Sequence, residues 1–380
     1  MAGYDLTRRI RSIASELGFE AVGIAPIEAL PGDPLDEWLT RNYHGEMQYM
    51  ARNRDKRLDP RLIFPEARSM VSVALSYGDL QEQPYEEPDR GVISKYAQGE
   101  DYHLILEDRL HKLLKRIREI APEADGRIYV DTGPVMDKAW ASRSGIGWLG
   151  KHTNILSRAL GSWFFLGEII LNLELEYDQA VDDHCGSCSR CIEACPTDAI
   201  VEPYVLDSRR CVSYLTIELR EDIPVELRKP MGNLIFGCDI CQDVCPWNRK
   251  SAVPSQVEEF QSRPAAESPP LDRLGELTPE DFSKEFRDSA VKRTKWRGLM
   301  RNVAVAMGNS GNSAFAQSLN RLLNTSDAMV RRHAAWALAQ LGGQQCLDLL
   351  RRRLSIESDA DTRSAIEEVL ARRPASLEEG

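Results

Sequence analysis

The chain contains the run Cys185-Gly-Ser-Cys188-Ser-Arg-Cys191-Ile-Glu-Ala-Cys195-Pro. Three of its cysteines fall within seven residues, and the fourth directly precedes a proline. This C-x2-C-x2-C-x3-C-P spacing is typical of segments that bind [4Fe–4S] clusters through cysteine thiolates. Structural zinc sites also use paired C-x2-C motifs, but they need neither the Cys-Pro ending nor such dense spacing. The run therefore favours iron–sulfur clusters over zinc.

A second, more widely spaced set of cysteines follows and ends in Cys245-Pro246. Eight thiolates suffice for two cubane clusters, and in two-cluster ferredoxins the last cysteine of each run binds the other cluster. We therefore assign one cluster to Cys185, Cys188, Cys191 and Cys245, and the second to Cys195, Cys211, Cys238 and Cys241. The ninth cysteine, Cys346, is expected to be a small core residue.

The rest of the chain is much larger than a cluster-binding module. It has 380 residues, of which 42% are hydrophobic and 28% charged. This length suggests two or three domains, and the ordinary composition excludes chain-long disorder. No run approaches the roughly 20 apolar residues that cross a bilayer, and no secretory signal is recognisable at the start. We expect a cytoplasmic protein with reduced thiols and no membrane partner.

Residues 1–180 are expected to form an α/β domain. Apolar residues recur at helical spacing over 5–18 and 102–120. No clean βαβ rhythm is present, so the sheet is not expected to be doubly wound, and no glycine-rich fingerprint indicates a dinucleotide site. Buried strands are predicted from short apolar runs at 21–24, 70–75, 128–130 and 163–173.

Three further segments complete the expected organisation. A ferredoxin-like insert with both clusters spans 181–250, and a proline-rich linker or wrap spans 251–290. Over 291–373, similar alanine-rich stretches begin 31 residues apart at Arg301, Arg332 and Arg363. This period predicts short HEAT-like helical repeats. Each arginine either faces a ligand or braces its own repeat.

Charge is distributed unevenly between these segments. Residues 291–373 contain 14 Arg and Lys against seven Asp and Glu, whereas residues 1–290 carry a net charge of −16. A basic module attached to an acidic body indicates a polyanionic partner, with a solvated helical surface as the alternative. The clusters themselves fit an electron carrier, but about 180 residues precede them, and one-electron centres beside a large domain usually supply a second cofactor.

Several further stretches resemble epoxyqueuosine reductases, in an order that covers nearly the whole chain. The resemblance implies a base-off cobalamin in the N-terminal domain, two [4Fe–4S] clusters behind it, and HEAT-like repeats that hold tRNA. The implied reaction is reduction of epoxyqueuosine to queuosine at the wobble position of the anticodon. The stretches are Val-Asp-Thr-Gly-Pro at 130–134, Ala-Ser-Arg-Ser-Gly-Ile-Gly-Trp-Leu-Gly-Lys at 141–151, Cys-Val-Ser-Tyr-Leu-Thr-Ile-Glu at 211–218 and Gly-Cys-Asp-Ile-Cys-Gln-Asp-Val-Cys-Pro at 237–246.

The same resemblance implies that Asp131 is the proton donor near the corrin. Opening an epoxide to an alkene releases the ring oxygen as water, and a carboxylic acid with a raised pKa could protonate that oxygen. From the residues alone, a helix N-cap is the alternative for Asp131, and Asp137 serves as a control carboxylate. Structural roles stay open for the other implied cobalamin contacts, which are Arg57, Ser94, Ile155, Ser162 and Ser213.

His103 is not expected to bind the cobalt. It follows Asp101, but the glycine of the Asp-x-His-x-x-Gly motif, which supplies a histidine lower ligand, is missing. Ser94 also departs from the family pattern, because a relative carries cysteine at this position. A contact from the Ser94 side chain to cobalamin is therefore in question. A cobalt without a strong lower ligand is easier to reduce, which suits the implied reaction.

The basic segment Lys292-Arg-Thr-Lys-Trp-Arg297 combines four cations with an aromatic residue. Such a mixture suits phosphate contact and base stacking, whereas a helix start with a core tryptophan is the alternative. The predicted tRNA contacts are Lys292, Arg293, Lys295, Arg297, Arg301 and Arg332.

Two other functions compete with the tRNA-modifying reductase. A reductive dehalogenase would share the cobalamin and both clusters, but it needs no basic repeats and usually carries an export signal. An electron carrier would bind no corrinoid. For the reductase, the expected partners are the tRNA anticodon stem-loop and a low-potential electron donor, and the chain is expected to be a monomer.

Overall fold

The computed structural model describes residues 2–78, 81–251 and 253–371. The chain divides into two compact units, each built from segments that are far apart in sequence. Both units contain part of the cysteine-rich region, so it does not form a compact unit by itself. Unit 1 comprises Met1–Gln81, Gly99–Arg209 and Asp239–Gln261, and unit 2 comprises Glu82–Gln98, Arg210–Cys238 and Ser262–Gly380.

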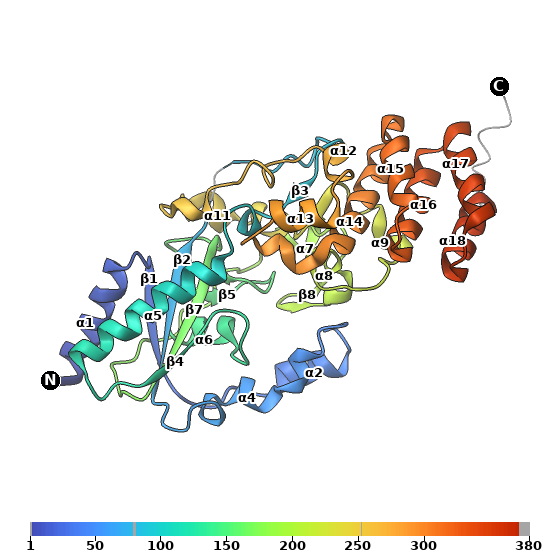
Figure 1. Ribbon diagram of the computed structural model, residues 1–380. Coiled ribbons are helices and arrows are strands. Elements are labelled where there is room, and N and C mark those ends of the chain that lie inside the picture. The colour runs from blue at the N-terminus through green and yellow to red at the C-terminus, as the bar shows by residue number, and fades with distance from the viewer. Residues whose placement is uncertain (1, 79–80, 252, 372–380) are drawn as a thin grey trace. The chain divides into compact units, whose positions relative to one another are not determined.

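Unit 1 is built on a four-stranded antiparallel sheet (Figure 1). The four predicted strands are confirmed, and their antiparallel pairing agrees with the expectation that the sheet is not doubly wound. Strand β7 is central and places Glu168 opposite Ser72 on one side and Tyr129 on the other. The order is β1 (Ala21–Pro26), β2 (Ser69–Ser76), β7 (Phe164–Leu171) and β4 (Gly126–Tyr129).

Helices cover both faces of this sheet. The predicted helices are confirmed as α1 (Ala2–Glu16) and α5 (Tyr102–Ile120), which pack against each other and against the sheet. Gly167 lets α5 approach β7 closely, because a Cβ atom there would lie 2.9 Å from Leu110. Helix α6 (Asp137–Arg143) packs on β1, β2 and β7, and its Trp140 belongs to the apolar cluster that contains Ile170 of β7.

The remaining elements of unit 1 are short. Helix α4 carries the buried Arg57, and the β5–β6 hairpin follows α6. Together they are α2 (Asp33–Thr40), α3 (Tyr49–Arg52), α4 (Arg54–Leu58), β5 (Trp148–Leu149), β6 (Ile155–Leu156), α7 (Arg190–Glu193), β8 (Ile200–Glu202), β9 (Val205–Leu206), α10 (Ile240–Asp243) and α11 (Pro246–Ser251).

Unit 2 is mainly helical. Helices α14, α16 and α18 carry the three similar stretches and pack against one another in that order (Figure 1). Their small residues allow a close approach, since a Cβ atom at Gly308 would lie 2.8 Å from Ala337. The helices are α8 (Val212–Ile217), α9 (Val225–Arg228), α12 (Leu271–Leu274), α13 (Pro279–Glu285), α14 (Lys295–Ser310), α15 (Ala316–Leu323), α16 (Ala328–Leu341), α17 (Gly343–Ile356) and α18 (Ala360–Ala371).

The segment expected to be a linker is not structureless. It contains α12 and α13, and α13 begins with a capping box in which Thr278 and Asp281 satisfy each other's backbone amides. A short parallel ladder joins β3 (Val92–Ile93) to β10 (Leu234–Phe236) in the same unit. Among the described residues, no helix has both the length and the apolar character that a membrane span needs.

Candidate functional site

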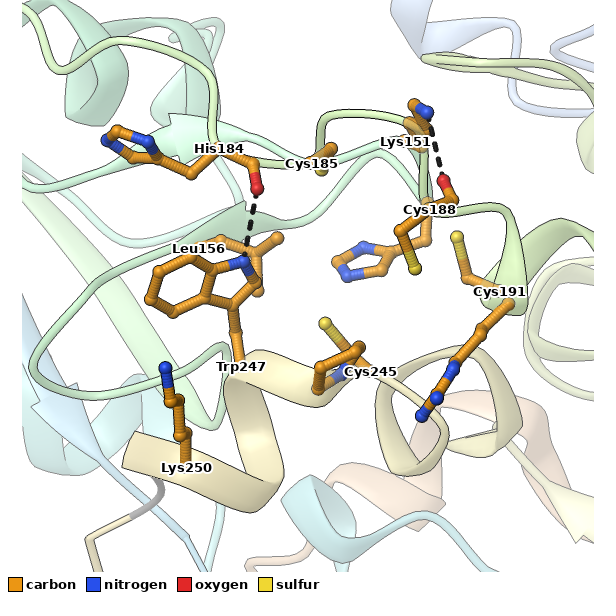
Figure 2. Close-up of a pocket in the computed structure, with 12 residues that line it drawn as sticks. Lys151, Leu156, His184, Cys185, Cys188, Cys191, Cys245, Trp247 and Lys250 are labelled. Atoms are coloured by element: carbon orange, nitrogen blue, oxygen red, sulfur yellow. Dashed lines mark hydrogen bonds between the residues drawn. The ribbon is translucent and has the colours of Figure 1, made fainter.

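Four cysteines of unit 1 line one cavity of about 290 Å³. Cys185 and Cys188 precede α7, Cys191 lies in its first turn, and Cys245 comes directly before α11. Figure 2 shows the sulfur atoms of Cys188, Cys191 and Cys245 pointing toward a common space. The structure thus brings together the four thiols expected to bind one cluster. A set of soft thiol donors suits iron–sulfur chemistry.

The loop that carries the first two thiols is held by side chains outside the cysteine motif. The Lys151 ammonium group donates hydrogen bonds to the carbonyl oxygens of Gly186, over 2.6 Å, and Cys188, over 2.9 Å. The backbone amide of Cys185 donates to a carboxylate oxygen of Asp183 over 2.7 Å. The loop conformation therefore depends on side chains outside the cysteine motif, and Lys151 was not among the predicted site residues.

Burial makes these thiols reluctant to ionise in the protein alone. Burial raises the pKa of Cys191 to about 11, and it also raises the pKa values of Cys185 and Cys245. Only thiolates bind iron, so cluster assembly must displace protons from this cavity.

The four cysteines predicted to bind the second cluster are divided between the two units. Cys195 and Cys241 lie in unit 1, whereas Cys211 and Cys238 lie in unit 2. Within unit 1, the Cys195 sulfur accepts a hydrogen bond from the Ala199 amide over 3.2 Å. The assignment of this set to the second cluster stays a prediction. The leftover Cys346 is buried in α17, as expected.

Asp131 sits in a sharp turn directly after β4. Its φ of +55° is left-handed, and the Thr132 amide donates to the Val130 carbonyl oxygen over 2.5 Å. Three-residue turns of this hand are rare and strained, and such strain is concentrated at functional sites. The carboxylate is exposed and accepts a hydrogen bond from the Tyr102 hydroxyl over 3.1 Å. Asp131 does not cap α6, whose N-cap is Met136.

His103 lies beside the same carboxylate. Its Nε2 is 3.6 Å from the Asp131 carboxylate, and its Nδ1 is 2.7 Å from Asp101, which caps α5. Burial alone would lower the pKa of His103, but the two carboxylates raise it to about 9. His103 is therefore protonated at neutral pH and paired with carboxylates.

Arg57 is buried close to this turn. Its guanidinium donates to the carbonyl oxygens of Gly133 and Tyr49 over 3.5 and 3.3 Å, and it interacts electrostatically with Asp137 and Asp131. Its Nε–H has no acceptor among the described residues. A buried donor without an acceptor fits a polar cofactor better than a dry core. This observation fits a corrin, whose rim carries carboxamide groups.

The other predicted cobalamin contacts have partners within their own units. Ile155 is buried in an apolar cluster, and the Ser162 hydroxyl donates to Gln242 over 2.8 Å. Ser94 is buried beside Gly237 in unit 2, and Ser213 is half-buried in α8. Contacts from these four residues to a cofactor stay predictions.

Two further carboxyl groups interact with each other and with the charge of Asp131. One is Glu168, which is fully buried in β7, and the other is Asp137, which was expected to serve as a control carboxylate. Sequence reasoning missed Glu168, although a glutamate inside the apolar strand run 164–171 is a visible signal.

The basic segment of unit 2 contains two kinds of cation. Lys292 and Lys295 are exposed and have no ionic or hydrogen-bonding side-chain partner among the described residues. Arg293 and Arg297 are also exposed, but they pair with Glu218 over 2.5 Å and Asp327 over 3.1 Å. Trp296 is half-buried and donates to the Leu277 carbonyl oxygen.

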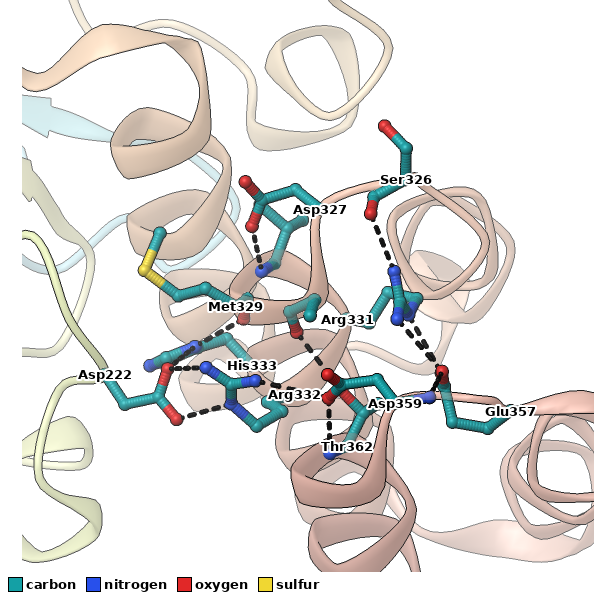
Figure 3. A network of polar contacts seen from close by, with 12 residues as sticks. Asp222, Ser326, Asp327, Met329, Arg331, Arg332, His333, Glu357, Asp359 and Thr362 are labelled. Carbon is teal, nitrogen blue, oxygen red and sulfur yellow. Dashed lines mark hydrogen bonds and ion pairs between the residues drawn. The ribbon is translucent and has the colours of Figure 1, made fainter.

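The arginines of the repeats do not share one environment. Arg301 is 0% exposed and donates to the backbone carbonyl oxygens of Leu215, Leu219 and Glu221. This position corrects the expectation of a tRNA contact from Arg301, because its guanidinium is enclosed and used within the unit. Arg332 is mostly buried and pairs with Asp222, as Figure 3 shows.

Family models match three parts of the chain. Residues 57–132 match the model described as epoxyqueuosine reductase QueG, DUF1730. Residues 184–248 match a 4Fe-4S double cluster binding domain, and residues 297–371 match HEAT repeats.

The chain is also similar to individual proteins over most of its length. It is 49% identical over 305 residues to the epoxyqueuosine reductase of Leadbetterella byssophila, covering 79% of this chain and 98% of that protein. It is 40% identical over 340 residues to the enzyme of Escherichia coli, covering 88% of this chain and 89% of that protein.

Solved structures agree with these relatives. An epoxyqueuosine reductase in complex with an epoxyqueuosine-modified tRNA-Tyr stem loop superposes with a TM-score of 0.91 at 28% identity, covering 97% of this chain and 98% of that one. The Bacillus subtilis enzyme, in a state with its catalytic aspartate loop swung out of the active site, superposes with a TM-score of 0.89 at 27% identity, covering 97% and 98%.

Proposed function

Because this chain belongs to the epoxyqueuosine reductase family, we propose that it reduces epoxyqueuosine to queuosine in the anticodon of tRNA. The observation that carries the proposal is the pairing, within unit 1, of a four-thiol cavity with the exposed carboxylate of Asp131. The first suits electron delivery and the second suits proton delivery. Both are needed to convert an epoxide to an alkene and water.

Two cofactor types fit this chain. Two [4Fe–4S] clusters would use the eight cysteines assigned above, and a base-off cobalamin would lie beside Arg57 and Asp131. When bound and reduced, cobalamin supplies a strong nucleophile and two electrons. Arg57 would hold it through the guanidinium, whose Nε–H lacks an acceptor among the described residues.

Asp131 would transfer a proton to the epoxide oxygen. The strained turn points its carboxyl group outward, and the Tyr102 hydroxyl and the His103 ring limit where that group can lie. A positioned acid of this kind typically contributes about 10²- to 10⁴-fold to a rate.

The helices of unit 2 would hold the tRNA as HEAT-like repeats. Lys292 and Lys295 are the best-placed phosphate contacts, because their charges are exposed and unpaired among the described residues. Arg293, Arg297 and Arg332 would have to leave or share their acidic partners. A low-potential donor would supply the electrons, and the chain would act as a monomer.

A direct assay tests this proposal. Anaerobically reconstituted protein with cobalamin and a low-potential reductant should convert an epoxyqueuosine-containing anticodon stem-loop to the queuosine form, detected by mass spectrometry of the nucleosides. Asp131→Asn should bind the stem-loop normally but turn over about 100-fold more slowly. Exposed Asp108 on α5 offers the matched control, Asp108→Asn.

A haloarene in a parallel reaction tests the dehalogenase alternative. The proposal would be overturned if the protein converted the haloarene but left the epoxyqueuosine of the stem-loop unchanged. The named relatives at 40–49% identity do not favour that alternative.

A further inference from the structure

Glu168 is a carboxylic acid in the interior of a sheet. It lies in the middle of β7 and is fully buried. Neither of its carboxyl oxygens receives a hydrogen bond from a conventional donor in the part of the chain that the structure describes. An isolated ionised carboxylate is among the most costly groups that a protein interior can hold. Glu168 must therefore carry a proton or share one.

The partner for such sharing is Asp137 at the start of α6. Gly167 faces α5, so Glu168, the next residue of the strand, points to the opposite face, where α6 packs. Asp137 and Glu168 act directly on each other's ionisation, and two carboxyl groups this close can bond to each other only through a shared proton. Paired carboxyl groups of this kind titrate as one unit and hold a proton into the neutral range.

Charged groups of both signs act on the pair. Arg57 and Lys138 favour its ionised form, whereas the charge of Asp131 favours the protonated form of both members. Burial and that charge raise the pKa of Asp137 to about 7, and burial raises the pKa of Glu168 well above its usual value.

The neighbouring strands place neutral residues opposite Glu168, and β4 also carries the cation Arg127, whose guanidinium lies over the Phe64 ring. The residues paired with Glu168 are Ser72 on β2 and Tyr129 on β4, and burial raises the pKa of Tyr129. The face covered by α5 presents Gly167 instead of Glu168. The shared proton is thus shielded on the sheet side, and the charge of Asp131 acts on the pair from the turn after β4.

The proposed reaction has an unmet requirement for a proton. Reduction of an epoxide to an alkene breaks both C–O bonds, forms the C=C bond and releases water, and it consumes two electrons and two protons. The low-potential donor supplies the electrons through the clusters, and Asp131 can supply one proton. After that transfer Asp131 is a carboxylate.

We propose that Asp137 and Glu168 form a proton-sharing pair that returns a proton to Asp131 and so supplies the second proton of the reduction. The proposal rests on the proposed function. The charge of Asp131 acts on both members of the pair, and this electrostatic interaction is mutual, so loss of a proton from the pair raises the proton affinity of Asp131. The pair acts through Asp131 and makes no contact with the reacting atoms.

His103 is the competing source, because it is protonated at neutral pH and its Nε2 lies 3.6 Å from the Asp131 carboxylate. A test must therefore distinguish the two. We would compare Glu168→Gln and Asp137→Asn with His103→Gln, and use the exposed Glu174, just beyond β7, for the matched control Glu174→Gln.

The first readout needs no turnover. Infrared spectra of the wild type at pH 7 should contain the band of a protonated carboxylic acid, which should disappear in Glu168→Gln and persist in Glu174→Gln. Absence of that band from the wild type would overturn the pair. Asp137→Asn gives a second variant in which Glu168 alone remains, in case the Glu168→Gln substitution disturbs folding.

The second readout is the single-turnover rate as a function of pH. We expect the wild-type rate to fall as pH rises above about 7, and Glu168→Gln to lose this dependence and turn over about 10- to 100-fold more slowly with unchanged stem-loop affinity. Suppose that Glu168→Gln turns over at the wild-type rate and that His103→Gln loses the pH dependence. The proton-sharing pair would then be refuted, while the proposed function would stand. A wild type that never converts the stem-loop would instead overturn the proposed function.

Discussion

Lys151 holds the backbone of Cys188, because its ammonium group donates to the Cys188 carbonyl oxygen over 2.9 Å. The same group also donates to Gly186, so one cation bridges two carbonyl groups of the loop between Cys185 and Cys188. Groups beyond the ligands orient a metal site, and nearby charge and hydrogen bonds tune the potential of a cluster. Lys151 is placed to do both.

We expect Lys151→Met to destabilise the first cluster and lower its reduction potential, because a positive charge favours the more negative, reduced cluster. Iron analysis should show loss from about eight toward about four iron atoms per chain during exposure to air. Lys250→Met is the control, because Lys250 lines the same cavity but lies over Trp247, 5.8 Å from its ring centre. Equal iron loss and equal potentials in the two variants would contradict the role of Lys151.

Arg301→Met should reduce stability, with little direct effect on tRNA affinity. The change leaves the carbonyl oxygens of Leu215, Leu219 and Glu221 without their donor, and the unsatisfied acceptor on the buried Leu215 alone costs about 1–3 kcal/mol. The melting temperature should fall by at least about 2 °C. The exposed Arg351 gives the control Arg351→Met, and a tRNA defect in a fully stable Arg301→Met protein would refute this prediction.

Lys292 and Lys295, which have no side-chain partner among the described residues, should dominate the salt dependence of tRNA binding. Each lost phosphate contact reduces the slope of log K against log[salt] by about 0.7 to 0.9, so Lys292→Ala with Lys295→Ala should reduce it by about 1.5. The double variant at Arg293 and Arg297 should change it less, because those side chains already pair with Glu218 and Asp327. Fluorescence anisotropy of a labelled stem-loop at several salt concentrations measures both slopes. Unchanged slopes would mean that the segment is only a solvated surface.

Glu168→Gln should stabilise unit 1 at alkaline pH. A buried carboxyl group with a raised pKa keeps its proton in the folded state while the unfolded chain has lost it. The folded state then binds more protons, so stability falls as pH rises from about 4 toward 7 and above.

Removing the carboxyl group removes this loss of stability. The melting temperature of Glu168→Gln should therefore exceed that of the wild type at pH 8, and the difference should shrink toward pH 4. Glu174→Gln should show no such trend. A variant that is less stable than the wild type at pH 8 would argue against the buried pair.

Much of unit 1 could be predicted because its signals are local. The apolar spacing over 102–120 predicted α5 with both ends correct, and short β-branched runs predicted four strands. Helical and strand periods are properties of neighbouring residues, so no knowledge of the fold is needed. The cavity of four thiols was also predicted, since three of its cysteines lie within seven residues.

The surroundings of Asp131 could not be predicted in the same way. Tyr102 was one residue of a predicted helix, and Asp137 was expected to be a control carboxylate. Their contacts with Asp131 and Glu168 join residues about 30 positions apart, across a sheet whose register is a tertiary property. In the sequence, Glu168 is visible only as a charged residue inside an apolar run. Its role cannot be inferred until the side chains that pack around it are known.

The sequence by itself determined the family of this protein, the secondary structure around its sheet and the spacing of its cysteines, because each is written in short-range patterns. Only the tertiary structure decided that Lys151 holds the Cys188 loop, that Glu168 meets Asp137, and that Arg301 is enclosed while Lys292 is exposed. An arginine and a lysine in one basic module look alike in sequence. Their roles separate only when packing decides which cation must satisfy buried carbonyl groups and which is left in water.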